Sequence, residues 1–363
     1  MKYFDLSKLI FSTKKKKVIA PHLQWHLTDK CNLRCSHCYQ DDYIEAGTDL
    51  DKMLDILEQF KCLVLFFRDQ GKPNIKGHIT LTGGEPLVKK GFYELLVEIN
   101  RLKEYFTFSI LTNATLIDIV WVQKLKSLNP KYIQVSLDGD KNKHDEIRGQ
   151  GSFEKSTKAI KLLRSANIRV LVSFTATKMN YLLFSSVSAI CRRLDVNFLW
   201  SDRLIPEGNA KSKNISENEM LLNKEETNQF FKLMRYEADI CKKDKNSVTR
   251  IRMHRALQFQ YSDDNIYRCV AGETLITIMP NGDLYPCRRM PVKVGNVFEN
   301  SLASIYFESP FLRKLRDKNT TSLGCEKCEH NKSCRGGLKC LSYATYGNAY
   351  KKDPGCLLGK EVV

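Results

Sequence analysis

Short runs of β-branched and aromatic residues alternate with segments of helical periodicity between residues 22 and 205. Apolar residues such as Met53, Leu57 and Phe60 recur every three or four positions, which predicts helices with one buried face, and Ser152 and Asn180 are expected as helix N-caps. Six runs predict strands, at residues 22–28, 78–82, 107–112, 132–137, 168–175 and 197–204. Six strand–helix alternations predict an α/β fold with a parallel sheet. Because eight would be needed to close a TIM barrel, we expect a partial (β/α)6 TIM barrel.

The chain beyond residue 206 has a different pattern. One amphipathic helix, with Phe230, Phe231 and Met234 on its apolar face, is predicted within a connector. Farther on the chain is rich in Cys, Gly and turn residues, and Asn281-Gly282 between two short apolar runs predicts a hairpin. We therefore expect four parts: an N-terminal tail (1–20), the partial barrel (21–206), a helical connector (207–265) and a small Cys-rich domain (266–363).

The composition of the 363-residue chain, 42% hydrophobic with a net charge of +17, is typical of a globular protein with a buried core. No signal peptide is evident, and no apolar run approaches the ~20 residues that a membrane span needs, so we expect a cytoplasmic protein with no membrane partner. Apart from the run Lys14–Lys17, many lysines stand singly on predicted helices. This is typical of a solvated surface, which disfavours a nucleic-acid partner but would suit an acidic peptide.

Cysteine is the residue type that points to chemistry. The chain has 13 cysteines, and an odd number without a signal peptide argues against a disulfide framework and for metal or redox chemistry. Three of them, Cys31, Cys35 and Cys38, share one tight loop after the first predicted strand. A 4Fe–4S cluster has four irons, so three thiolates leave one iron open for a substrate or cofactor. A structural zinc site usually has four protein ligands, so the zinc alternative requires His37 or a distant group.

This loop, followed by the aromatic Tyr39, resembles the signature of the radical S-adenosylmethionine (SAM) superfamily, and the resemblance extends over residues 20–205. It implies reductive cleavage of SAM to a 5′-deoxyadenosyl radical, with electrons from a reductant such as flavodoxin or ferredoxin. It also implies that SAM is bound at the strand ends, by Gly83, Gly84, Glu85, Asn113, Ser136 and Arg148. Turn capping is an equal alternative for Asn113 and Ser136. No catalytic acid or base is indicated.

A second cysteine array resembles the SPASM extension of radical SAM enzymes that modify peptides and proteins. The resemblance implies two auxiliary 4Fe–4S clusters, and hence three 4Fe–4S clusters in all. One auxiliary cluster would be held by Cys325, Cys328, Cys334 and Cys356. The other would be held by Cys269, Cys287 and Cys340, with its fourth ligand unidentified. A zinc ribbon is the alternative, because Cys-x2-Cys pairs also bind zinc.

The array departs from the SPASM pattern at two positions. Leu338 stands where the usual spacing places a cysteine, which is displaced to Cys340. The sulfatase-maturating relatives carry a catalytic Asp directly after the cysteine that matches Cys287, and this chain has Arg288 there. Sulfatase maturation is therefore disfavoured.

The favoured function is a maturase that modifies a ribosomal peptide or a protein side chain through a thioether or carbon–carbon cross-link, epimerisation or oxidation. Because the first predicted strand begins near residue 22, leader-peptide binding is expected to need a separate protein or another surface. The alternative is modification of a tetrapyrrole side chain in the haem pathway, whose enzymes have a similar Gly295-Asn296 and closing Asp353–Cys356 segment. A non-enzymatic metal protein that binds nucleic acid is the third hypothesis.

Overall fold

The computed structural model describes residues 20–40, 43–44, 48–212, 220–262 and 266–358. The predicted N-terminal tail, with Lys14–Lys17, lies outside the described residues except for residue 20. The chain forms two compact units. The first unit comprises Met1–Cys31, Ile44–Ile110 and Val270–Asp317, and the second comprises Asn32–Tyr43, Leu111–Cys269 and Lys318–Val363.

The first unit is built on a sheet whose central strand is β1 (His22–His26). β1 pairs in parallel with β2 (Gly77–Thr82), which pairs in parallel with β3 (Phe106–Thr112). On its other edge, β1 pairs in parallel with β8 (Leu275–Ile278), with His22 opposite Leu275. β9 (Asp283–Tyr285) and β10 (Gly295–Asn296) continue the sheet in antiparallel orientation. The predicted hairpin at Asn281-Gly282 is confirmed as the β8–β9 turn.

The helices of the first unit bury their apolar faces against this sheet and against one another. α1 (Leu50–Asp69) is capped by Asp49, which accepts from Lys52 N at 2.9 Å, and its predicted face (Met53, Leu57 and Phe60) is buried. Phe60 stacks on Phe106 of β3 with 5.5 Å between ring centroids. The remaining helices are η2 (Pro86–Val88), α2 (Phe92–Arg101), α10 (Leu302–Glu308) and α11 (Pro310–Arg316).

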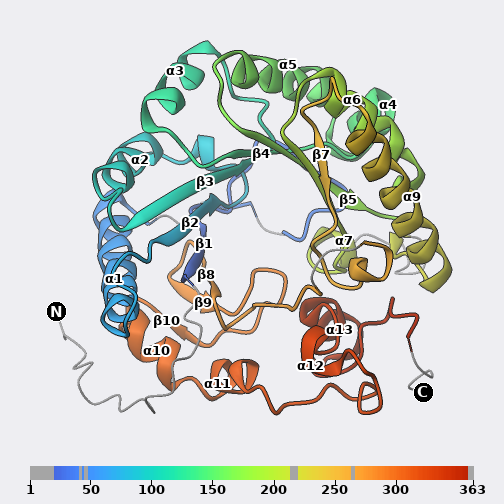
Figure 1. The fold of residues 1–363 in the computed structure, drawn as a ribbon. Helices are drawn as coiled ribbons and strands as arrows, with labels where there is room; N and C mark the ends of the chain where they lie inside the picture. Colours follow the sequence, from blue (N-terminus) through green and yellow to red (C-terminus); the bar gives the residue numbers. More distant parts are fainter. Residues whose placement is uncertain (1–19, 41–42, 45–47, 213–219, 263–265, 359–363) are drawn as a thin grey trace. The chain divides into compact units, whose positions relative to one another are not determined.

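The second unit contains four parallel strands in the order β4 (Ile133–Ser136), β5 (Val170–Ala176), β6 (Phe198–Arg203) and β7 (Arg250–Arg252). α5 (Ser152–Ser165), α6 (Phe184–Arg193) and α9 (Lys224–Lys243) pack along this sheet (Figure 1). The other helices are α3 (Ile119–Leu128), α4 (Lys141–Arg148), η3 (Tyr181–Leu183), α7 (Asn209–Ser212), η4 (Gln258–Tyr261), α12 (Asn331–Cys334) and α13 (Lys339–Tyr346).

The predicted α/β class with parallel strands is confirmed, and all six predicted strands are present. The connector helix is α9, and Phe230, Phe231 and Met234 are buried as predicted. The N-cap prediction for Ser152 is wrong, because Gly151, with its left-handed backbone (φ +75°), is the N-cap of α5. Asn180 is at the N-cap position of η3, which leads directly into α6, but its side chain makes no capping hydrogen bond. Across the described ranges, no helix is both long enough and apolar enough to cross a membrane.

Candidate functional site

The cysteine loop after β1 is held by hydrogen bonds to the ends of two other segments. Cys38 N–H donates to Cys35 O at 3.2 Å, which closes a tight turn, and Ser36 N–H donates to Ile147 O at 2.9 Å. At the start of the loop, the Asn32 side-chain oxygen accepts from Asn113 Nδ2 at 2.9 Å. Asn113 directly follows β3, so this bond ties the cysteine loop to a strand end. The hydrogen bonds therefore give the loop from Asn32 to Cys38 a defined backbone path.

Asp138 is the buried centre of the contacts behind this loop. Its side chain has no solvent exposure, and Oδ2 accepts from Arg148 Nε at 2.5 Å and lies 3.3 Å from His37 Nε2. Oδ1 accepts from Thr175 N–H at 2.8 Å. Arg148 Nη1 also reaches Cys35 Sγ at 3.8 Å. Asp138 thus holds the Arg148 guanidinium against Cys35, and it also contacts the imidazole of His37, the residue before Cys38.

The charges around Asp138 reinforce one another. Burial alone would raise the pKa of Asp138, but Arg148, His37 and the Thr175 N–H outweigh it and hold the pKa well below its ordinary range. Burial would likewise lower the pKa of Arg148, whereas Asp138 and Cys35 raise it. Both groups are therefore charged at neutral pH. The pair places a fixed positive charge beside the Cys35 sulfur, where it stabilises a thiolate.

Asn180 and His144 hold the backbone of Asp138. Asn180 Nδ2 donates to Asp138 O at 2.9 Å and to Thr175 O at 3.0 Å. Asp138 N–H donates to His144 Nδ1 at 3.2 Å. Sequence reasoning predicted Asn180 only as a helix N-cap and singled out neither Asp138 nor His144. The signal available was the Asp138-Gly139 pair at the end of a predicted strand, where a polar residue follows a buried run.

The segment after β6 also packs on the cysteine loop. Ala210 N–H donates to Cys38 O at 3.1 Å, and Asn209 Nδ2 donates to Tyr43 Oη at 2.8 Å. Gly208 has φ +62°, and a Cβ there would collide with the backbone of Tyr39. A residue without a side chain is thus required at this approach. The turn residues of Pro206–Asn209 signalled a loop, and only the fold shows what the loop touches.

In the first unit, Gly83-Gly84-Glu85 lies against the backbone that leads to Cys31. Gly84 N–H donates to Thr28 O at 2.7 Å, and Glu85 N–H donates to Lys30 O at 3.0 Å. A Cβ on Gly83 would meet Thr28 O and one on Gly84 would meet Lys30 O, so the two backbones approach closely only because both residues are glycine. Glu85 is fully buried and caps η2 by accepting from Leu87 N–H at 3.2 Å.

The remaining SAM-site candidates have different surroundings. Ser136 is the last residue of β4 and is partly exposed. The Asn113 side chain accepts from Thr115 N–H at 2.9 Å, so it caps a turn while also donating to Asn32. Arg148 is paired with Asp138. Contact between SAM and Ser136, Asn113 or Arg148 stays a prediction.

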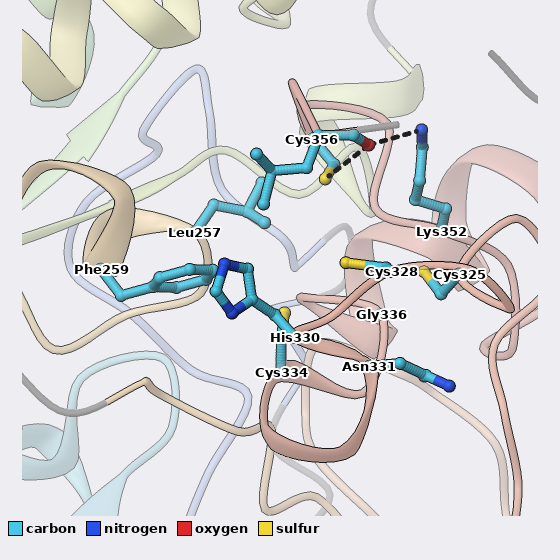
Figure 2. Close-up of a pocket in the computed structure, with 11 residues that line it drawn as sticks. Leu257, Phe259, Cys325, Cys328, His330, Asn331, Cys334, Gly336, Lys352 and Cys356 are labelled. Carbon is cyan, nitrogen blue, oxygen red and sulfur yellow. Dashed lines mark hydrogen bonds between the residues drawn. The ribbon is translucent and has the colours of Figure 1, made fainter. Parts of the chain in front are cut away.

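Four cysteines of the second array line one pocket in the second unit. Cys325 and Cys328 come from the turn before α12, Cys334 ends α12, and Cys356 comes from the C-terminal segment (Figure 2). His330 also lines the pocket, and its ring meets Phe259 edge to face with 5.1 Å between centroids. Aromatic and aliphatic side chains thereby shield the thiols, as expected around a metal cluster.

Burial affects the protonation of these thiols. It raises the pKa of Cys325 to about 11 and that of Cys334 to about 12, and the neighbouring cysteines add to the shift. Without a metal these thiols would stay protonated at neutral pH. A cluster that binds them has to displace their protons and supplies the positive charge that makes thiolates stable there.

The four-cysteine pocket supplies the ligand type and number of a closed 4Fe–4S cluster, in which each cysteine binds a different iron. Four thiolates also suit a structural zinc site. By contrast, the cysteines predicted for the other auxiliary cluster are divided between the units, with Cys287 in the first and Cys269 and Cys340 in the second.

Comparison with known families agrees with both cysteine arrays. Residues 25–192 match the radical SAM superfamily, and residues 269–334 match SPASM, an iron–sulfur cluster-binding domain. Residues 25–192 therefore form a radical SAM domain and residues 269–334 a SPASM domain, so the chain is an enzyme whose cofactors are SAM and iron–sulfur clusters.

Its relatives fall into two groups. The AdoMet-dependent heme synthase of Nitratidesulfovibrio vulgaris is 27% identical over 361 residues, which cover 92% of this chain and 91% of the relative. The antilisterial bacteriocin subtilosin biosynthesis protein AlbA of Bacillus subtilis is 28% identical over 351 residues, covering 93% and 71%. In fold, the chain is similar to SuiB of Streptococcus suis bound to S-adenosylmethionine, with a TM-score of 0.71, 21% identity and coverage of 93% and 77%. SuiB has also been solved with its precursor peptide SuiA.

Proposed function

We propose that this enzyme modifies a side chain of a ribosomal peptide or protein, by thioether or carbon–carbon cross-linking, epimerisation or oxidation. The observation that carries the proposal is the pocket lined by Cys325, Cys328, Cys334 and Cys356 within and just after the SPASM region. Oxidative cross-linking leaves a surplus electron on the product, and a buried auxiliary cluster is an acceptor for it. The bacteriocin biosynthesis protein AlbA and the SuiB–SuiA complex support a peptide substrate.

Ten cysteines would hold three 4Fe–4S clusters, in the groups assigned from the sequence. Cys31, Cys35 and Cys38 would hold the SAM cluster, which supplies reductive cleavage of SAM as the source of the 5′-deoxyadenosyl radical. The chain's own residues orient this site. Asp138 fixes Arg148 beside Cys35, and the glycines at 83 and 84 lie close against the backbone of Thr28 and Lys30, which leads to Cys31. Flavodoxin or ferredoxin would deliver the electron, and a separate protein would bind the leader peptide.

Modification of a tetrapyrrole is the second candidate, because the heme synthase of N. vulgaris matches over nearly the full length of both chains. The two candidates are separable by direct assay. The anaerobically reconstituted enzyme is incubated with SAM, dithionite and either a short Cys-rich peptide or an iron porphyrin with propionate side chains. Loss of hydrogen atoms from the peptide, or deuterium incorporation at an α-carbon, is expected by mass spectrometry. Decarboxylation of the porphyrin with an unchanged peptide would contradict the proposal.

Cys328→Ala is expected to lower the iron content by about four per chain, since one ligand of a closed four-cysteine cluster is lost. Deoxyadenosine formation should persist because the SAM-cluster loop is untouched, whereas peptide modification should fail. Iron and sulfide analysis after anaerobic purification checks the first point, and chromatography of the products checks the second. Cys62→Ala, on α1 and in neither array, is the control and should keep full iron. Full iron in Cys328→Ala would refute the assignment.

A further inference from the structure

We propose that Asp353 is a positioning residue that sets the geometry of the four-cysteine pocket by fastening its two loops to the end of β6 through Arg203. The proposal rests on the assignment of Cys325, Cys328, Cys334 and Cys356 to one cluster. Asp353 is not itself a ligand, but it would determine whether the four cysteines lie close enough together to bind one cluster.

Asp353 and Arg203 form a two-pronged ion pair in the interior of the second unit. Arg203 Nη1 donates to Oδ1 at 2.8 Å, and Nη2 donates to Oδ2 at 2.7 Å. The aspartate has no exposed surface and the arginine side chain is 5% exposed. Arg203 is the last residue of β6, so the carboxylate is held against a strand whose position is fixed by its pairing with β5 and β7. A parallel fork of this kind fixes orientation as well as distance.

The same carboxylate also accepts from the two loops that carry pocket cysteines. Leu338 N–H, four residues after Cys334, donates to Oδ2 at 2.9 Å. Gly355 N–H, directly before Cys356, donates to Oδ1 at 2.9 Å. The backbone continues the pattern, because Asp353 N–H donates to Gly336 O at 2.9 Å and Cys356 N–H donates to Asp353 O at 3.0 Å. One residue therefore joins the Cys334 segment to the Cys356 segment.

The space around this carboxylate is shaped for aspartate. A Cβ on Gly337, whose φ is +84°, would collide with the Asp353 side chain, and a Cβ on Gly355 would collide with Arg203 Nη1. Both neighbours approach closely only because they lack side chains.

A purely stabilising role does not account for this arrangement. Replacing a buried ion pair by packed apolar groups is often neutral for stability, so such a pair is weak evidence for a stability role. Here each oxygen of the Asp353 carboxylate accepts one guanidinium N–H and one backbone N–H. The charged group therefore fixes the positions of both loops relative to Arg203. Residues around metal ligands commonly act in this way, by orienting the ligands they touch.

The test compares Asp353→Asn with Glu237→Gln in the full chain, purified anaerobically. Asparagine keeps the shape but turns one acceptor into a donor that faces Arg203 and Leu338 N–H. Glu237→Gln removes another buried carboxylate of the same unit, which pairs with the partly exposed Arg192 at 3.1 Å and is not among the residues that line the four-cysteine pocket. Asp353→Asn is expected to lose about four irons per chain, or to retain a cluster with an altered EPR spectrum and midpoint potential. Glu237→Gln is expected to keep the full iron content and an unchanged EPR spectrum and midpoint potential, even if its melting temperature falls as much as that of Asp353→Asn.

Three outcomes decide the matter. Full iron with an unchanged EPR spectrum and midpoint potential in Asp353→Asn would overturn the inference. If Asp353→Asn does not yield soluble protein, Arg203→Lys decides instead, because it keeps the charge but cannot form the fork, and the same loss or spectral change is expected. Cys328→Ala separates the ligand assignment from the role of Asp353. Full iron in that variant refutes the ligand assignment itself, whereas iron loss there with an intact Asp353→Asn refutes only the role of Asp353.

Discussion

Replacing Cys35 by alanine is expected to abolish the formation of 5′-deoxyadenosine from SAM. The loop offers three thiolates, and with two left the cluster loses an essential ligand. Arg148, whose Nη1 lies 3.8 Å from the Cys35 sulfur, would also lose the negative group that it faces. The measurement is anaerobic reconstitution, dithionite reduction and quantification of deoxyadenosine, together with iron content. Iron is expected to fall by about four per chain while the pocket cluster remains.

Two variants make the Cys35 result interpretable. Cys62→Ala should retain activity, which excludes a general effect of losing a thiol. Cys328→Ala should retain deoxyadenosine formation, which separates the SAM cluster from the auxiliary cluster. Continued SAM cleavage by Cys35→Ala at the wild-type rate would mean that the loop does not bind the catalytic cluster.

Asp138→Asn is expected to lower both the free energy of unfolding and the rate of SAM cleavage. Removing one partner of a buried ion pair leaves an uncompensated charge, here on Arg148, at a cost of about 3–5 kcal/mol. The Arg148 guanidinium would no longer be held beside Cys35, so the cysteine loop would lose this contact. Urea unfolding followed by circular dichroism measures the stability, and deoxyadenosine formation measures the function.

Asp140→Asn is the matched control for Asp138→Asn, two residues away. Asp140 caps α4 by accepting from Lys143 N–H at 3.0 Å, and asparagine caps helices about as well as aspartate. We therefore expect Asp140→Asn to be close to wild type in both measurements. Equal stability of Asp138→Asn and Asp140→Asn would show that the Asp138 pair is not a structural centre of the site.

The parts predicted correctly were those with strong local signals. The six strands were predicted because β-branched runs between helical segments leave few other structures for the chain. The hairpin at Asn281-Gly282 was predicted because its turn demands a residue that tolerates positive φ, and Gly282 has φ +85°. The capping roles predicted for two side chains are not seen. Ser152 donates to Asp145, and Asn180, although at the N-cap position of η3, donates to Asp138 O, so both side chains are used in tertiary contacts instead.

The cysteine spacing predicted iron–sulfur chemistry, and the radical SAM and SPASM matches agree with it. Which cysteine binds which cluster stays a prediction. The supporting roles of Asp138 and Asp353 could not be predicted, because a buried carboxylate and a surface carboxylate look alike in sequence. Their partners stand 10 or 150 residues away in the two ion pairs, with no local pattern to link them. The need for glycine at 208 could not be predicted either, because it depends on contact with the distant Tyr39 backbone.

By itself, the amino-acid sequence determined the order of strands and helices, the sheet's parallel character and the two cysteine arrays, because each depends on neighbouring residues and their spacing. Tertiary structure alone decided that β8 pairs with β1, 253 residues earlier in the chain, and that Asp353 meets Arg203. Both contacts join segments that are far apart in the sequence, and they form because burying those segments against each other removes apolar surface from water. Which segments pair therefore depends on the packing of the whole unit and cannot be predicted from a short stretch of residues.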